Sequence, residues 1–403
     1  MHSRIRPLAA TAAAVVACAL TLTPFGMAQA AVVPTPPTTS APEAALSLSA
    51  IGSYETGVFD ESAAEIVQAH GDRLFVVNAQ AGSLSVLDNA DPTAITELFA
   101  VSSTGVANSV AIRDDGLGVI AFEATDKVSD GHLVFFDANA TSADAAVLGT
   151  VTVGALPDMV SISTDGAYAV VANEGEPADD FSVDPEGSIA VVTLPGTVAA
   201  PAQDAVRIAD FHAFEAEGAL PADVRVFGPT VGDGNPVSRN LEPEYITVEG
   251  GTAYATLQEA NAIAVVDLDS ASVTGIHPLG FKDYSTATLD PSDRDDTIEQ
   301  RSYEGLKGIY MPDAIDSYTS GGTTYLVTAN EGDAREWGDY VEASRVKDLE
   351  DDGYGPVCAD SALAGSLGDA DLGRLNVTIE NGFDETAGCY DELYAFGGRS
   401  FSI

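Results

Sequence analysis

A strand-rich unit recurs along this chain at a spacing of roughly 40–50 residues, and this recurrence limits the possible folds more than any other feature. Each copy contains a short apolar strand, a turn, a second apolar strand, a polar loop and a third strand. A fourth apolar run often follows. The five copies occupy residues 65–88, 108–137, 157–192, 243–267 and 312–331.

One sheet of this kind leaves apolar faces exposed to water, so neighbouring units must stack to form a core. Four short antiparallel strands per repeat are typical of a propeller blade. A β-sandwich is the competing fold, but it predicts no self-similarity at this period. We therefore predict an all-β chain folded as a β-propeller of four-stranded blades, of which these residues contain five to six.

Three polar insertions and the last residues depart from the regular repeat. Insertions at residues 197–240, 281–306 and 332–370 are expected to decorate the rims of the ring. Residues 375–379 resemble a late strand of the fifth unit, and residues 393–403 resemble the start of a sixth. Because an open ring would leave an unpaired edge, we expect that a longer protein or another chain closes it.

Residues 1–30 have the features of a signal peptide, because Arg4 and Arg6 precede a short apolar stretch and a small-residue cleavage site. Residues 31–45 read as a Pro/Thr-rich linker, and residues 46–403 as a propeller domain that is incomplete at its C-terminal end. The apolar stretch is too short for a membrane helix. We expect no transmembrane span in the mature chain, which is secreted or anchored to the cell surface through a missing C-terminal segment.

The chain is strongly acidic, with 62 Asp and Glu residues against 17 Lys and Arg and a formal net charge of -45. Hydrophobic residues still make up 45%, which is enough for a packed core. The absence of basic clusters in the sequence argues against nucleic acid as a partner. We expect a divalent cation and an unidentified extracellular ligand or protein as partners. The alternative is that the acidic residues only keep the protein soluble.

Two cysteines remain after removal of the signal peptide, which contains Cys18. An even pair in an oxidising compartment predicts a disulfide between Cys358 and Cys389, and the alternative is two free thiols. Closing a loop of about 30 residues in this way would contribute ~3–4 kcal/mol in the loop-entropy description.

Two loops that follow second strands share the pattern Asn-Glu-Gly-acid. Their oxygen-bearing side chains and flexible glycine suit calcium, which is the expected cofactor. The alternative is that asparagine and glycine only shape the turn while glutamate faces solvent. The predicted metal ligands are Asn173, Glu174, Glu176, Asn330, Glu331 and Asp333.

Three carboxylates, Asp158, Glu244 and Asp313, each follow a proline at the start of a first strand. The first strand of a blade lines the channel, so we expect these side chains at its mouth, with Lys307 and Arg335 as cationic counterparts. The alternative is a turn in which proline fixes the backbone and the acid accepts from nearby N–H groups. No catalytic residue is assigned, because the chain has no Gly-x-Ser-x-Gly sequence and its histidines are scattered.

Four segments carry a resemblance to the choice-of-anchor I domain family, and the resemblance extends over about residues 45–403. The segments are residues 51–57, 172–177, 311–315 and 328–335. The resemblance implies an exported propeller of about seven blades, related to mesenchyme-specific cell-surface glycoproteins. Some members of the family are labelled alkaline phosphatase or phytase-like.

Two functions remain open at this point. The first is a secreted or cell-surface module that binds a ligand through acidic, calcium-binding loops, and the scarcity of basic residues favours it. The second is a metal-dependent phosphoesterase in which the acidic loops hold calcium while Lys307 or Arg335 meets phosphate. A propeller fold by itself does not decide between them.

Overall fold

The computed structural model describes residues 38–39, 43–58, 64–229 and 236–403. The signal peptide predicted at residues 1–30, and most of the linker predicted at residues 31–45, lie outside the described residues. Within the described part, no helix is both long enough and apolar enough to cross a membrane.

Four sheets in the described part each contain four antiparallel strands joined in chain order. The first contains β3 (Val67–His70), β4 (Arg73–Asn78), β5 (Ser83–Asp88) and β6 (Thr96–Ser102). The second contains β7 (Val106–Ile112), β8 (Leu117–Glu123), β9 (Asp130–Asp137) and β10 (Val147–Ala155). The third contains β11 (Pro157–Ile162), β12 (Tyr168–Asn173), β13 (Ser188–Thr193) and β14 (Val206–Ala209). The fourth contains β15 (Pro243–Glu249), β16 (Thr252–Leu257), β17 (Ala262–Asp267) and β18 (Ser272–Pro278).

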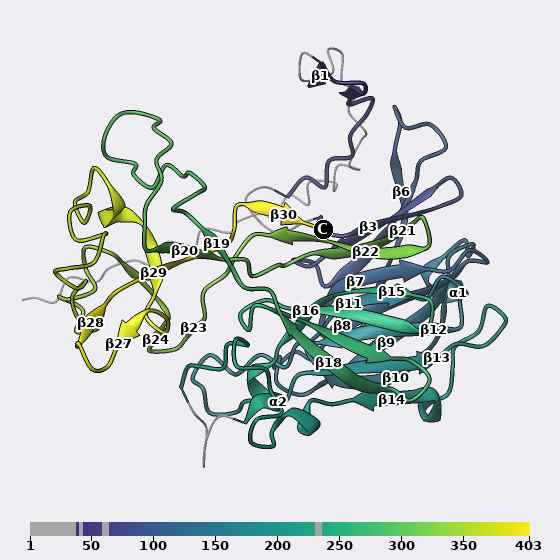
Figure 1. Cartoon of the computed structure of the whole chain (residues 1–403). Helices are drawn as coiled ribbons and strands as arrows, with labels where there is room; N and C mark the ends of the chain where they lie inside the picture. Colours follow the sequence, from purple (N-terminus) through teal and green to yellow (C-terminus); the bar gives the residue numbers. More distant parts are fainter. Residues whose placement is uncertain (1–37, 40–42, 59–63, 230–235) are drawn as a thin grey trace, which may run out of the picture.

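The sheets stack face to face around an axis that their first strands share (Figure 1). Strand β7 contacts β3 on one side and β11 on the other, and β11 contacts β15. An apolar cluster fills each interface, with Phe75 and Phe122 in the first and Phe135 and Val171 in the second. Every residue of β8 is buried, because neighbouring sheets cover both of its faces. The predicted propeller of four-stranded blades is confirmed.

The fifth blade contains β21 (Ile315–Ser320), β22 (Thr323–Asn330) and β30 (Ser400–Ser402). Strand β30 pairs antiparallel with β22, so it takes the place of a third strand although about 70 residues separate the two in sequence. Residues 393–403 therefore do not begin a sixth unit, and residues 375–379 are not a late strand of the fifth blade. Apolar alternation predicted strands in both places but could not identify their partners.

The chain between β22 and β30 joins residues 281–309 in a separate body, which we call the side unit (residues 281–309 and 343–396; Figure 1, beside the blades). Its sheet has the order β19-β20-β29-β26-β25. The strands are β19 (Phe281–Asp283), β20 (Leu306–Ile309), β25 (Ala343–Arg345), β26 (Asn376–Thr378) and β29 (Leu393–Phe396). An apolar cluster that includes Tyr284, Leu306, Leu372 and Leu393 forms its core. Two of the insertions expected as rim loops thus fold together.

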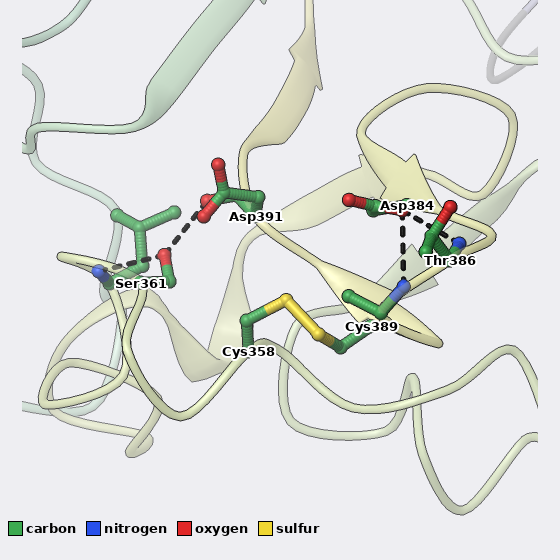
Figure 2. The surroundings of a disulfide bond; sticks show 8 residues. Cys358, Ser361, Asp384, Thr386, Cys389 and Asp391 are labelled. Atoms are coloured by element: carbon green, nitrogen blue, oxygen red, sulfur yellow. Dashed lines mark hydrogen bonds between the residues drawn. A yellow bond between two sulfur atoms is a disulfide. The ribbon is translucent and has the colours of Figure 1, made fainter.

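The predicted disulfide between Cys358 and Cys389 is confirmed and lies in the side unit (Figure 2). It joins the loop after β25 to β28 (Cys389–Tyr390), which pairs with β27 (Phe383–Asp384). Beside it, the Ser361 hydroxyl donates to the carbonyl of Asp391 at 2.8 Å. The side unit has few long strands, so this covalent link contributes to its order.

The remaining elements are short. The insertion at residues 197–240 first completes the third blade with β14, and its described part then includes two short helices before β15. The short helices are α1 (Ala143–Ala146), η1 (Gln203–Ala205), η2 (His212–Phe214), α2 (Val237–Asn240) and η3 (Leu372–Arg374). The small two-stranded pairs are β1 (Thr38–Thr39) with β2 (Leu48–Ser49), and β23 (Glu336–Trp337) with β24 (Tyr340–Val341).

Candidate functional site

A polar cavity of about 440 Å³ lies where the third, fourth and fifth blades meet, and we call it the acid cavity. Six of its nine lining residues carry a carboxyl group, and none of the lining residues is Lys or Arg. The lining residues are Asp158, Glu174, Glu244, Tyr245, Gln258, Asp313, Glu331, Gly332 and Asp333. Equivalent positions in three blades therefore bring carboxylates to one place.

The carboxylates at the start of the first strands reach the cavity from similar positions, each directly after a proline. Asp158 and Glu244 are the second residues of β11 and β15, and Asp313 lies two residues before β21. In the third and fourth blades the pairing with the second strand shifts register directly after Pro157 and Pro243. Such an irregularity redirects the following side chain, which explains why these acids face the cavity and not a neighbouring sheet.

Two of these segments also hold a strained residue before the proline. Leu156 and Met311 have φ values of 46° and 45°, a left-handed conformation that side chains rarely adopt. Their carbonyls accept hydrogen bonds from the loops after the second strands, Leu156 from the Glu174 N–H at 2.8 Å and Met311 from the Gly332 N–H at 3.1 Å. Strain of this kind persists where the surrounding structure holds it, often beside a functional site.

The structure separates the six predicted metal ligands. Glu174, Glu331 and Asp333 line the acid cavity, whereas the two asparagines and Glu176 do not. Glu176 is half-buried, which raises the pKa of its carboxyl, while Lys127 opposes that rise. The three lining residues follow the second strands β12 and β22, as the loop pattern predicted.

The asparagines instead hold their own blades together. The Asn330 amide donates to the hydroxyls of Ser400 at 3.1 Å and Ser402 at 2.8 Å, which attaches β30 to β22. The Asn173 amide donates to the hydroxyl of Ser188 at 3.2 Å, between β12 and β13. Both asparagines are buried. Their contacts are structural, but they join neighbouring strands, whereas the alternative considered for the loop pattern was a role in shaping the turn.

Crowding of like charges perturbs the acids of the cavity. Burial, together with repulsion from the nearby carboxylates of Asp313, Glu123 and Glu65, raises the pKa of Asp158 to about 7. Burial, followed by repulsion from neighbouring acids, also raises the pKa of Glu174 and Glu244 well above the usual range. Ionised carboxylates in this cavity are therefore unfavourable in free energy, and a bound cation would reduce their mutual repulsion.

The predicted cationic counterparts lie elsewhere. Lys307 is on β20 in the side unit, 3.4 Å from Asp283 and 3.9 Å from Glu392. Arg335 is buried and forms an ion pair with Glu242 at 2.7 Å, with its guanidinium also over the ring of Phe227. Neither side chain lines the acid cavity. Spacing along the sequence could not show that both cations form ion pairs with carboxylates outside the cavity.

Two lining residues, Gln258 and Tyr245, were not among the predicted site residues. Gln258 is the first residue after β16, the position that Glu174 and Glu331 occupy in their blades. When the Gln258 amide nitrogen faces Glu244, it donates to both carboxylate oxygens of Glu244, at 2.9 and 3.0 Å. Tyr245 adds a phenol beside them, and burial together with the surrounding carboxylates raises its pKa to about 12. Alignment of the second strands was the signal for Gln258.

Within the described residues, no group of three or more His, Cys, Asp or Glu side chains is close enough to enclose a bare metal ion. The carboxylates instead line the wall of a cavity wider than an ion. Calcium readily keeps water ligands between itself and a carboxylate. The arrangement thus suits a hydrated cation better than a closed protein cage.

Comparison with known proteins gives relatives on two levels. A segment of 161 residues is 38% identical to the mesenchyme-specific cell surface glycoprotein of Strongylocentrotus purpuratus. This segment covers 36% of this chain and 20% of that protein. The chain therefore spans only about a fifth of that relative's length. Among solved structures, a protein from Lactobacillus plantarum shares 16% identity over 71% of this chain and 66% of its own, with a TM-score of 0.38. The Myceliophteria thermophila Cps50 (Swd1) beta-propeller domain shares 9% identity over 61% of this chain and 59% of its own, with a TM-score of 0.32.

The family match is far more extensive. The choice-of-anchor I domain matches residues 65–403, a range that includes all five blades, the acid cavity and the side unit. The chain therefore belongs to the choice-of-anchor I domain family.

Proposed function

We propose that this protein is an extracellular binding module whose acid cavity takes up a cation, with calcium as the expected ion. One observation supports this most directly: three blades contribute six carboxylates to a single cavity whose lining contains no Lys or Arg. Assembling like charges is unfavourable unless protons or a cation compensate them. The name of the Strongylocentrotus purpuratus relative, a cell surface glycoprotein, supports the extracellular setting.

Calorimetric titration of the metal-free protein with calcium chloride tests the proposal. We expect saturable binding that Glu174→Gln and Asp313→Asn each weaken at least tenfold, because each removes one charge from the wall of the cavity. Glu217→Gln is the matched control, since Glu217 is exposed and does not line the cavity. Absence of calcium binding by the wild type, or equal binding by all three variants, would contradict the proposal.

The phosphoesterase alternative remains a prediction from the sequence and the resemblance. The two cations assigned to phosphate, Lys307 and Arg335, are both in ion pairs outside the cavity, so we favour the binding module. A phosphate-release assay on p-nitrophenyl phosphate with added calcium separates the two functions. The binding module predicts no turnover, whereas calcium-dependent turnover that Glu174→Gln abolishes would establish the hydrolase.

A further inference from the structure

A second cavity of about 410 Å³ adjoins the acid cavity and opens toward the side unit. The two cavities share Gly332 and Asp333 in their linings. The loop after β22 is therefore a common wall, with blades on one side and the side unit on the other. A ligand larger than an ion that occupies the acid cavity would extend into this second cavity.

Arg399 lines the second cavity, is exposed, and forms no ion pair or hydrogen bond with any described residue. Arg374 in the same lining differs, because its guanidinium donates to both Asp293 carboxylate oxygens at 2.8 and 3.0 Å. In a chain with 62 acidic against 17 basic residues, carboxylate partners are abundant. A guanidinium beside an acidic cavity that still lacks one is available to a ligand.

The backbone fixes Arg399 relative to the acidic loop. Gly397 packs so closely that a side chain there would lie 1.9 Å from the carbonyl oxygen of Glu331. The Gly398 N–H donates to the Asn330 carbonyl at 3.1 Å. Arg399 itself has a φ of 44°, a left-handed conformation unusual for arginine. The turn is thus pressed against the segment that presents Glu331 and Asp333 to the acid cavity.

The charges of the second cavity predict the order of binding. Its lining includes the carboxylates of Asp290, Asp333 and Glu336, which repel an anion. Arg374 is already paired, so Arg399 is the cation left to oppose them among the described lining residues. An anion would bind well only after a cation in the acid cavity has neutralised part of this charge.

We propose that Arg399 binds an oxyanion, a phosphate or carboxylate group, of the ligand whose cation lies in the acid cavity. The inference rests on the proposed function and makes the ligand a cation–oxyanion pair, not a cation alone. The planar guanidinium suits either oxyanion, because its N–H groups can donate to two oxygens at once. The cation and Arg399 would hold the ligand from opposite sides of the shared loop.

The test is calorimetry on the full chain in two steps, calcium first and then methyl phosphate or sodium acetate in separate titrations. Arg399→Gln keeps a polar side chain on the same strained backbone, and Arg294→Gln is the control because Arg294 is exposed outside both cavities. We expect Arg399→Gln to weaken oxyanion binding at least tenfold while calcium affinity and melting temperature stay as in the wild type. The tighter of the two probes identifies the group.

Each step reports on one claim. Loss of the calcium step in the wild type overturns the proposed function and this inference with it. Normal calcium binding followed by oxyanion binding that is equal in wild type and Arg399→Gln overturns this inference alone. Oxyanion binding that does not depend on calcium would also overturn it, since the acidic lining must first be neutralised.

Discussion

Buried charge occurs in two neighbouring regions of this molecule with opposite arrangements. In the acid cavity, carboxylates meet one another and are left without a basic partner in the lining. Close to it, Arg335 pairs with Glu242 and Arg225 pairs with Glu342, with both guanidiniums over the ring of Phe227. We call these four charged residues the paired cluster. In the paired cluster, arginines of the chain neutralise the buried acids. In the acid cavity, only protons or a ligand can neutralise them.

The two regions are connected through the backbone. Arg335 lies two residues after Asp333, and Glu242 lies two residues before Glu244, so one ion pair joins the segments that carry two cavity acids. The Glu342 carboxylate also accepts from the Arg335 N–H at 3.2 Å. Buried acids stabilise the fold where an arginine pairs with them, and we propose that they bind a cation where no arginine does.

Breaking the paired cluster should have the largest effect. Arg335→Met leaves Glu242 buried and without its partner, which we expect to reduce the free energy of unfolding by about 3–5 kcal/mol. Urea denaturation monitored by circular dichroism measures the change. The double variant Arg335→Met/Glu242→Met should recover much of the loss, because both charges are gone. A single variant as stable as the wild type would contradict the assigned structural role.

Calcium should have the next largest effect, and it should act on the acid cavity alone. At a free calcium concentration 100 times the dissociation constant, we expect stabilisation of about 2.7 kcal/mol, seen as a rise in melting temperature. Glu174→Gln should reduce that rise, whereas Glu217→Gln should preserve it. An equal rise in both variants would place the calcium elsewhere in the molecule.

The third effect concerns the pH dependence of stability. The pKa of Asp158 is about 7 in the folded protein against 3.8 as its ordinary value, so the folded state binds the extra proton between these values. Stability from this group is therefore greatest below about pH 4 and is lost as the pH rises toward 7. Asp158→Asn in EDTA should raise the free energy of unfolding at pH 8 by up to about 4 kcal/mol, the limit set by the shift of this pKa from 3.8 to about 7.

The same variant should match the wild type at about pH 3, where the carboxyl is largely protonated in both the folded and the unfolded state. Urea titrations at the two pH values measure the difference. Glu217→Gln is the control and should leave the pH dependence as it is in the wild type, since Glu217 lies outside the cavity. A variant that is less stable than the wild type at pH 8 would show that Asp158 is not strained by burial.

Much of the candidate site could be predicted from the sequence, because its residues lie in short motifs that recur in each repeat. The acids after Pro157, Pro243 and Pro312, and those after β12 and β22, occupy equivalent positions in repeated units. Repeats that stack around one axis bring equivalent positions to the same end, so alignment alone predicted that these acids lie together. Gln258 follows the same rule, but it was left out of the predicted site residues because its amide makes this loop a weaker match to the acidic pattern.

The sequence by itself therefore determined the periodic features, namely the blades, their strand order and the convergence of acidic turns. It also determined the pairing of Cys358 with Cys389. What only the tertiary structure decided is long-range: β30 as a third strand of the fifth blade, the side unit assembled from separate insertions, and the capture of Lys307 and Arg335 by distant acids. The physical reason is that hydrophobic alternation and charge are local properties, whereas partner choice depends on which distant surfaces pack together and exclude water.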